Sequence, residues 1–342
     1  MDNFFRGSSK DKPERLTTPY LIGNSSEIAD IRKDIEKVGN TDLTVLILGE
    51  TGTGKGLLAS SLHNNSVRKS RPFVSINCAN IPNHLMESEL FGYKRGAFTG
   101  AWKDKIGKFE LAANGTIFLD EISEMTTSMQ AKLLQVLQDG KFSPVGGLDT
   151  IQVNVRFISA TNSDLGHLIS TNRFRLDLYY RLAVLCFYVP PLKNRKEDII
   201  PLTKYFIDKY STYYDKKTIS PTLKMYNYLQ NYNWPGNVRE LENTIKTLVV
   251  LENEDMVINE MENKIIKEGN ISTRNDKIED GAFSSCRGPM TLKQYVDMER
   301  ECAEKKIIRE VLRKTNGNKK KTAELLQVSY KCILNKVKNY GL

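Results

Sequence analysis

The chain has 342 residues, of which 40% are hydrophobic and 27% charged, enough for two or three domains with packed cores. No apolar run approaches the roughly 18 residues that cross a bilayer, and the first residues lack the apolar stretch of a signal peptide. The five cysteines are scattered without a C-x-x-C pair, which indicates reduced thiols and argues against a disulfide framework or a zinc site. We therefore expect a cytoplasmic protein with no membrane partner.

The net charge of +9 is concentrated at one end of the chain. From Arg313 to Leu342 there are eight basic residues and one acid, Glu324, whereas the rest of the chain is nearly neutral. Such a basic end favours contact with a polyanion, most simply DNA or RNA. A merely solvated charged tail is the alternative, and the apolar residues that recur among the lysines argue against it.

The chain begins with a leader and an α/β region. Residues 1–19 are polar and show no period, which predicts a flexible leader. Residues 20–191 alternate short, almost wholly apolar runs with amphipathic helical stretches. This pattern predicts an α/β subdomain whose parallel sheet is covered on both faces. The predicted strands are Thr44–Leu48, Phe73–Asn77, Thr116–Asp120 and Val155–Thr161.

Three further segments follow the α/β region. Residues 192–267 carry only helical patterns, such as Asp198–Tyr210 and Val238–Leu251, and predict a small all-helical subdomain. Residues 268–290 are rich in Gly, Ser, Asn and charge, which predicts a linker. Helical periodicity resumes in residues 291–342.

A glycine-rich loop joins the first predicted strand to a predicted helix, Leu57–His63, with the spacing G-x-x-x-x-G-K. Its glycines let backbone N–H groups close around phosphate oxygens, and the helix N-terminus adds partial positive charge. We expect Lys55 to reach the β- and γ-phosphates of ATP. A glycine-rich turn with a stray lysine is the alternative, which the strand, loop and helix context disfavours. The predicted ATP-binding residues here are Gly49, Glu50, Thr51, Gly52, Thr53, Gly54, Lys55 and Gly56.

Gly56 departs from the general motif, which places there a Ser or Thr that holds Mg²⁺. Magnesium would then rest on phosphate oxygens, water and other carboxylates. A glycine in the first turn of a helix also costs roughly 1 kcal/mol relative to alanine. This position favours weaker nucleotide binding or slower turnover.

The third predicted strand ends in Asp120 and Glu121, at the carboxyl edge of the sheet, where ligands of open α/β sheets bind. Alone, two acids after a strand are often a solvated loop. Beside a phosphate-binding loop they predict an ATPase, in which Asp120 holds hydrated Mg²⁺ and Glu121 polarises the attacking water.

A second glycine-flanked loop has Phe98 as its only large side chain. The segment Glu87–Gly92 leads into Gly96–Ala101, which reads GAFTGA. An apolar residue at such a tip is either tucked into a groove or offered to a partner, and periodicity does not decide between the two.

The GAFTGA string and its flanks resemble the signature of the sigma-54-dependent transcriptional activators, bacterial enhancer-binding ATPases of the AAA+ class. The resemblance runs from about Leu21 to segment 234–241 and resumes at the C-terminal end. It implies that the loop touches the sigma-54 subunit of promoter-bound RNA polymerase, with Phe98 and Thr99 at its centre. The implied contact residues are Gly96, Ala97, Phe98, Thr99, Gly100 and Ala101.

The same resemblance implies roles for polar residues elsewhere. Asn77 matches the asparagine that holds the catalytic glutamate until nucleotide is sensed, although alone it would read as a turn former. Thr161 and Asn162 match a first sensor of the γ-phosphate. Arg239 matches a second sensor of phosphate, and nearby Trp234 is expected to pack rather than to take part in the chemistry.

Two arginines match the family's arginine fingers. Arg175 and Arg181 would elsewhere read as surface charges. The resemblance implies that they reach the γ-phosphate of a neighbouring subunit, an effect worth roughly 10³–10⁵ in rate in well-studied cases. A ring of identical subunits, hexameric by resemblance, follows, with hydrolysis that depends on assembly.

The basic end predicts a helix-turn-helix. Glu299–Lys314 reads as one helix, Lys319–Gln327 as a second with Ala323, Leu325 and Leu326 inward, and Tyr330–Tyr340 as a third with Ile333, Leu334 and Val337 buried. The spacing resembles the Fis-like module of many sigma-54 activators, with a solvated helical hairpin as the alternative. The predicted contacts to double-stranded DNA at upstream enhancer sites are Lys319, Lys320, Lys321, Ser329, Lys331, Asn335, Lys336 and Lys338.

These features together predict an ATP- and Mg²⁺-dependent activator of sigma-54 RNA polymerase. One alternative is a DNA-binding regulator that binds nucleotide without turnover, which Gly56 favours and the other site residues oppose. Another is an AAA+ remodeller acting on different clients, which the pairing of GAFTGA with a helix-turn-helix opposes. Fewer than about 20 residues precede the family-like segment. Control by a separate partner, control by protein level and a shortened chain all remain open.

Overall fold

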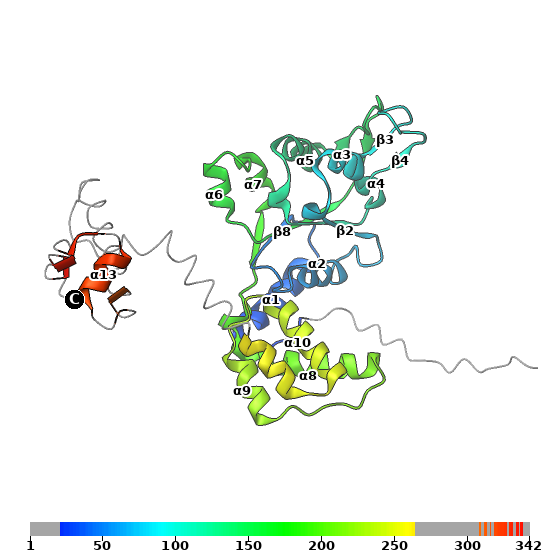
Figure 1. The fold of residues 1–342 in the computed structure, drawn as a ribbon. Coiled ribbons are helices and arrows are strands. Elements are labelled where there is room, and N and C mark those ends of the chain that lie inside the picture. Colours follow the sequence, from blue (N-terminus) through cyan, green and yellow to red (C-terminus); the bar gives the residue numbers. More distant parts are fainter. Residues whose placement is uncertain are drawn as a thin grey trace, which may run out of the picture. The chain divides into compact units, whose positions relative to one another are not determined.

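The computed structural model describes residues 21–263 and, in the C-terminal part, residues 308, 311–312, 315, 318–326, 328–330, 333–334 and 336–337. The chain forms two compact units, divided between Met261 and Glu262 (Figure 1). The predicted leader, 1–19, and the predicted linker, 268–290, lie outside the described residues. The domain boundaries therefore stay predictions.

A five-stranded parallel sheet, in the order β2-β5-β8-β1-β9, forms the centre of the first unit. Four strands are those predicted, with β1 and β8 each beginning one residue later than expected. The sequence patterns did not single out β9, an edge strand in which only Phe187 is buried. The bounds are β1 Val45–Leu48, β2 Phe73–Asn77, β5 Thr116–Asp120, β8 Arg156–Thr161 and β9 Leu185–Tyr188.

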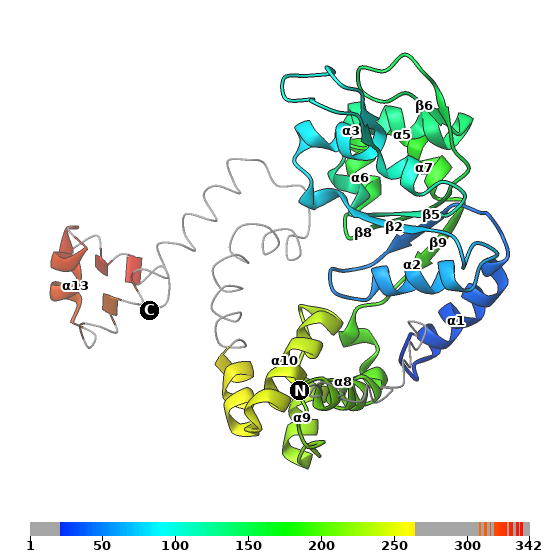
Figure 2. The ribbon, with the colours of Figure 1, turned by 90° about the vertical axis from the view of Figure 1, so that its right-hand side faces the viewer.

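Helices cover both faces of the sheet, as a parallel arrangement requires. Figure 2 shows α1 and α2 on one face, and α3, α5, α6 and α7 on the other. The side chains of β5 alternate accordingly: Phe118 packs in one core, and Ile117 and Leu119 pack in the other. The bounds are α1 Ser26–Gly39, α2 Lys55–Asn64, α3 Asn83–Phe91, α4 Lys108–Leu111, α5 Thr127–Asp139, α6 Leu165–Ser170 and α7 Leu176–Leu182.

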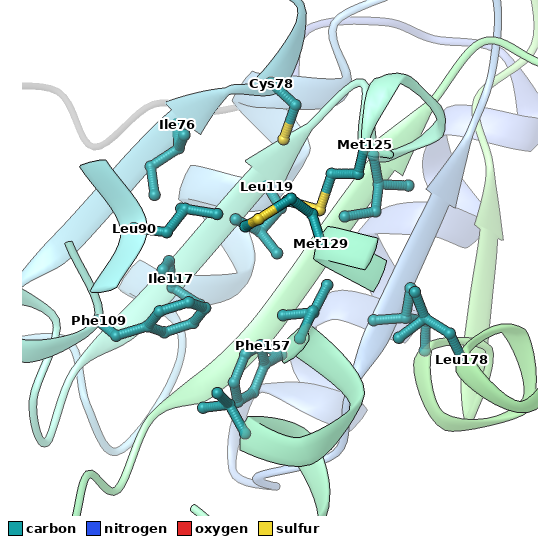
Figure 3. Close-up of a cluster of buried hydrophobic side chains, with 14 of the residues drawn as sticks. Ile76, Cys78, Leu90, Phe109, Ile117, Leu119, Met125, Met129, Phe157 and Leu178 are labelled. Carbon is teal, nitrogen blue, oxygen red and sulfur yellow. The ribbon is translucent and has the colours of Figure 1, made fainter. Parts of the chain in front are cut away.

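The larger of these two cores holds β5 in place. Figure 3 shows Leu119 of β5 with Leu90 of α3 and Met129 of α5, and Ile117 with Phe109 of α4. Each side chain is 4% exposed or less, and burial of a side chain of this size contributes about 1.5–3 kcal/mol. Because β5 is locked from both faces, the acids that end it have a fixed position.

A small helical subdomain follows β9 in the same unit. It contains α8 (Ile199–Tyr213), α9 (Leu223–Asn231) and α10 (Asn237–Leu251), and residues 254–263 are also helical. Its core packs around Trp234, which is 1% exposed and donates through Nε1 to the Leu229 carbonyl at 2.8 Å. The predicted helical character of this region and the packing role of Trp234 are both confirmed.

Two short hairpins extend beyond the sheet. One pairs β3 (Gly92–Tyr93) with β4 (Lys105–Ile106), and the other pairs β6 (Lys141–Phe142) with β7 (Ile151–Gln152). They lie against each other: the N–H of Lys94 donates to the Val145 carbonyl at 3.0 Å. At Gly146, with φ +72°, an added Cβ would lie 2.6 Å from the Cβ of Ala97.

The second unit is described only in part. Helix α13 (Lys319–Leu325) begins at Asn318, whose Oδ1 accepts hydrogen bonds from the N–H groups of Lys320 and Lys321. Ile308, Ala323, Ile333 and Val337 form a small core. The expectation that Leu325 and Leu334 lie inward is wrong, since they are 66% and 38% exposed. Ala323 and Leu326 take the inward positions near Leu325, and Ile333 and Val337 take those near Leu334. Within the described residues, no helix combines the length and apolarity needed to cross a bilayer.

Candidate active site

The glycine-rich loop runs from the end of β1 to the start of α2, as expected. Gly52 and Gly54 have φ values of +80° and +106°, a region that side chains disfavour. Gly54 immediately precedes the first residue of α2, which is Lys55. Backbone N–H groups in such a turn, together with the helix N-terminus, form an anion-binding concavity.

Lys55 turns its side chain back into this loop and is 6% exposed. Its Nζ atom donates to the carbonyls of Gly49, at 2.9 Å, and Glu50, at 3.4 Å, and lies 3.5 Å from Oε1 of Glu121. The lysine and the proposed catalytic acid are therefore in direct contact.

The two acids at the carboxyl end of β5, Asp120 and Glu121, differ in their surroundings. Burial, and then the neighbouring charge of Glu121, raise the pKa of Asp120, whereas Lys55 and Arg239 oppose that shift. Glu121 has φ +52°, in a region that non-glycine residues rarely occupy. Its Oε2 accepts a hydrogen bond from the backbone N–H of Asn162 at 3.2 Å. Strained backbone held by several contacts is typical of functional sites.

The end of β8 connects the loop to the acid. The side chain of Asn162 donates to Oγ1 of Thr51 at 2.9 Å, while its backbone N–H contacts Glu121. Thr161 is buried and donates to the hydroxyl of Ser123 at 3.0 Å. Asn162 therefore joins the phosphate-binding loop to Glu121.

Asn77 lies beside Asp120, because the two residues pair in register between β2 and β5. Its Oδ1 accepts from the N–H of Ala79 at 3.0 Å and so caps the turn that follows β2. In the described part of the chain no hydrogen bond joins Asn77 to Glu121. The expected restraint of Glu121 by Asn77 stays a prediction.

Arg175 and Arg181 lie at the two ends of α7. Arg175 forms a two-point ion pair with Asp177, at 3.0 Å and 2.7 Å, and this contact raises the pKa of Arg175. Arg181 is exposed. Among the described residues, neither arginine forms an ion pair with the phosphate loop or with the acids after β5, so neither serves this chain's own site through such a contact.

Arg239 lies in the first turn of α10, and its backbone N–H donates to the carbonyl of Gly52 at 3.2 Å. Its charge acts on Asp120, because it is among the causes that oppose the raised pKa of that acid. The helical subdomain thus brings a guanidinium to the phosphate loop.

The sequence reasoning missed a buried polar network around this loop. Arg195, 3% exposed, donates to the Thr53 carbonyl at 2.8 Å and lies 3.8 Å from Asp198. Asp198 accepts from the backbone N–H groups of Asn24 and Ser25 at 2.6 and 2.7 Å. Nothing in the local pattern around Arg195 distinguishes it from a surface arginine. The sequence reasoning also missed Asn237, although this residue lies in segment 234–241, which had been singled out for Arg239.

The GAFTGA loop closes on itself at the tip of the β3–β4 hairpin. The N–H of Gly96 donates to the Ala101 carbonyl at 2.9 Å, and that of Ala101 donates to the Phe98 carbonyl at 3.0 Å. Phe98 is 44% exposed, with its ring edge-on to Tyr93 at 4.9 Å. One part of the Phe98 side chain therefore packs against Tyr93, and the rest is exposed to solvent. Thr99 and Gly100 are exposed, as is Trp102, which the sequence reasoning did not single out.

The predicted DNA contacts are described only in part. Lys319, Lys320 and Lys321 form the exposed first turn of α13. Ser329 is exposed and Lys336 is half-buried. The other predicted contacts, Lys331, Asn335 and Lys338, lie outside the described residues.

A parallel sheet, a phosphate loop with a buried lysine against an acid, and a helical subdomain carrying an arginine to that loop together define a P-loop nucleotide-binding protein of the AAA+ class. Residues 21–187 match the Sigma-54 interaction domain, residues 193–277 the AAA+ ATPase lid domain, and residues 299–340 the Fis family of bacterial regulatory proteins. The chain belongs to the sigma-54-dependent transcriptional activators.

Similar proteins share much of this chain. It is 39% identical over 328 residues to the regulatory protein AtoC of Escherichia coli (strain K12), which is 94% of this chain and 68% of AtoC. It is 47% identical over 245 residues to the nitrogen fixation protein VnfA of Azotobacter vinelandii, which is 72% of this chain and 47% of VnfA. The crystal structure of NtrX from Brucella abortus in complex with ATP matches with a TM-score of 0.66 and 31% identity, covering 94% of this chain and 70% of that one. The chain thus spans between about half and two thirds of these relatives' lengths.

Proposed function

We propose that this protein hydrolyses ATP to move the GAFTGA loop and so remodels the closed promoter complex of sigma-54 RNA polymerase while bound to upstream DNA. The contact of Lys55 with Glu121, at 3.5 Å beneath a phosphate-binding loop, carries the proposal. Solved NtrX structures hold ATP and ADP, which supports the same ligand here.

Hydrolysis needs a base, a cation at the phosphates and an oriented water. Glu121 is the base, and its held position beside Asn162 suits it to accept a proton from water above the γ-phosphate. Lys55 supplies the cation at the β- and γ-phosphates, and Asn162 orients the water. Thr161, whose buried hydroxyl donates to Ser123 and accepts from the N–H of Ser163, supports the turn that carries Asn162. Because each group is preorganised, little rearrangement is needed at the moment of reaction.

Magnesium fits the residues present. Mg²⁺ in proteins is usually held by one or two carboxylates, the substrate's phosphates and several waters. Asp120, at the carboxyl end of β5, offers such a carboxylate, and Gly56 offers none. Bound there, Mg²⁺ would neutralise charge that develops on the transferred phosphoryl group.

Assembly into a ring would bring two further positive charges, Arg175 and Arg181, to the ATP of a neighbouring subunit. Both arginines are exposed at the two ends of α7, and Arg175 would exchange its ion pair with Asp177 for the phosphate of a neighbouring subunit. In a ring, hexameric by family, they would meet the γ-phosphate bound next door and stabilise its transition state.

The GAFTGA loop and the basic end give hydrolysis its target. The half-exposed ring of Phe98 suits a contact with sigma-54, and the glycines beside it allow the tip to move. The exposed lysines at the start of α13 suit phosphates of double-stranded DNA.

Phe98→Ala should abolish sigma-54-dependent transcription in vitro while leaving ATP hydrolysis intact. The matched control is Leu148→Ala, because Leu148 is fully exposed on the neighbouring hairpin. Phe73→Ala would not serve, because Phe73 of β2 packs against the hydrophobic core.

The central experiment measures phosphate release against protein concentration for wild type, Glu121→Gln and Glu124→Gln. Glu124 is an exposed acid three residues away and serves as the control. We expect activity per subunit to rise with concentration, Glu121→Gln to lose about 10²–10⁴-fold in kcat, and Glu124→Gln to match wild type. Activity that is unaffected by Glu121→Gln would contradict the proposal.

A second candidate is a DNA-binding regulator that binds nucleotide without turning it over, and Gly56 is the feature that favours it. Comparing phosphate release by wild type and Gly56→Glu separates the two. A silent wild type that the acidic variant restores would favour this second candidate. An active wild type that fails to bind sigma-54 with a γ-phosphate transition-state analogue would instead favour a remodeller with other clients.

A further inference from the structure

Asn237, the first residue of α10, is 0% exposed, and its side chain joins three parts of the chain. Its Oδ1 accepts from the N–H of Leu192 at 2.7 Å. Its Nδ2 donates to Oε2 of Glu50 at 3.0 Å and to the Thr51 carbonyl at 3.1 Å. Because a buried polar group left without a partner is unfavourable, these bonds hold the helix start in place.

The backbone of Asn237 shows the same constraint. Its φ is +53°, a left-handed conformation that asparagine tolerates better than most residues. Its N–H donates to the Trp234 carbonyl at 2.8 Å. A strained residue persists where its surroundings determine it, and here the surroundings are the phosphate loop and the fully packed Trp234.

Glu50 is the partner on the phosphate loop. The hydrogen bond from Asn237 and the nearby Lys193, whose Nζ lies 3.3 Å away, hold the pKa of Glu50 below its usual range. The backbones also touch: an added Cβ on Gly52 would lie 2.4 Å from the Gly236 carbonyl. Two residues beyond Asn237, the N–H of Arg239 donates to the carbonyl of Gly52.

We propose that Asn237 is a positioning residue that locks the start of α10 onto the phosphate-binding loop through Glu50, and so sets how Arg239 meets a bound nucleotide. The inference rests on the proposed function for the identity of the ligand. Since Asn237 and Arg239 share the first helical turn, a shift of the helix start displaces the guanidinium with it.

The test exchanges the donor and the acceptor of the hydrogen bond between Asn237 and Glu50. Asn237→Asp places a carboxylate against Glu50 but keeps an acceptor for Leu192, and it should weaken binding of a fluorescent ATP analogue about tenfold. The double variant Glu50→Gln/Asn237→Asp exchanges donor and acceptor and should recover the part of the loss that passes through Glu50, although the bond to the Thr51 carbonyl stays lost. Asn253→Asp, the same change at an exposed residue of the helical subdomain, is the matched control and should bind as wild type does.

A second arm asks whether the effect passes through Arg239. In an Arg239→Ala background, Asn237→Asp should change the dissociation constant by less than about twofold, because the group that it positions is gone. An undiminished effect in that background would overturn the proposal. So would a double variant no better than Asn237→Asp, or a variant that lowers the melting temperature without changing the dissociation constant.

The readouts keep this inference apart from the proposed function. Binding of the analogue is measured at equilibrium and phosphate release separately. A wild type that binds but releases no phosphate would contradict the proposed function, while the comparison of dissociation constants still decides the role of Asn237. A wild type that binds no nucleotide would overturn both.

Discussion

The Nζ atom of Lys55 lies 3.5 Å from Oε1 of Glu121, and the same amino group donates to two carbonyls of the phosphate loop. The lysine proposed to bind phosphate and the acid proposed to activate water are therefore in direct contact. A charge in this buried position interacts more strongly with its neighbours than it would in water.

Replacing Lys55 by methionine keeps the length of the side chain and removes its charge. Because charged hydrogen bonds contribute about 1.5–3 kcal/mol, Lys55→Met should weaken ATP binding by about 10–100-fold. Lys69→Met makes the same change at an exposed lysine and should have no effect. Titration with a fluorescent ATP analogue measures both, and equal affinities would contradict the role of Lys55.

Gly56→Ala should stabilise the protein. Gly56 lies in the first turn of α2, its φ is not positive, and an added Cβ would meet nothing closer than Cε1 of Phe118 at 3.8 Å. Alanine in a helix is favoured over glycine by about 1 kcal/mol. Thermal unfolding should show a rise of about 2–4 °C. Gly52→Ala is the contrasting change, since its Cβ would meet the Gly236 carbonyl at 2.4 Å, and it should destabilise.

Arg181→Ala should abolish ATP hydrolysis, and mixing this variant with Lys55→Met should restore it. Alone, Arg181→Ala and Lys55→Met should each lose most ATPase activity, by about 10³-fold or more for the arginine. In mixed rings, an intact loop from the first variant meets an intact Arg181 from the second, so activity should return. Arg173→Ala, at an exposed arginine of the same segment, should stay active. A mixture that remains silent would place Arg181 outside the shared site.

Asp42 should stabilise the fold at neutral pH but not at acid pH. Arg68, 8% exposed, donates through Nε and Nη2 to both carboxylate oxygens at 2.9 Å and holds the pKa of Asp42 below its usual range. The pKa of Asp42 is lower in the folded protein than in the unfolded chain, where it is about 3.9. The ion pair therefore stabilises the fold at any pH above about 3.9, and this stabilisation is lost as the pH falls through the pKa of the folded state. Asp42→Asn should therefore cost about 1 kcal/mol near neutrality, after allowance for the exposure of Asp42.

Urea unfolding at several pH values checks this dependence. The difference between wild type and Asp42→Asn should narrow as the pH falls below about 4. Asp30→Asn removes a carboxylate from an exposed pair with Lys33 and should show a small difference throughout. A gap for Asp42→Asn that is independent of pH would rule out the carboxylate as its cause.

The sequence predicted the centre of the fold because its signals are local. Four apolar runs became four strands, and the glycines, Lys55 and the two acids at the carboxyl end of β5 meet where the carboxyl ends of parallel strands converge. The edge strand β9 was missed although its sequence, Leu185–Tyr188, is as apolar as the four predicted strands. Long-range contacts were hidden: nothing in the residues around Arg195 or Asn237 shows that they contact the phosphate loop, more than 130 residues away in the chain.

The close packing of Ala97 against Gly146 has a consequence for anyone who redesigns this protein. With 2.6 Å between the Cβ of Ala97 and the place where a Cβ at position 146 would lie, Gly146 accepts no side chain unless Ala97 shifts. A hairpin taken from a relative must therefore keep glycine at position 146 to pack against the hairpin that presents Phe98. A chimaera that lacks this glycine must take both hairpins from the same donor.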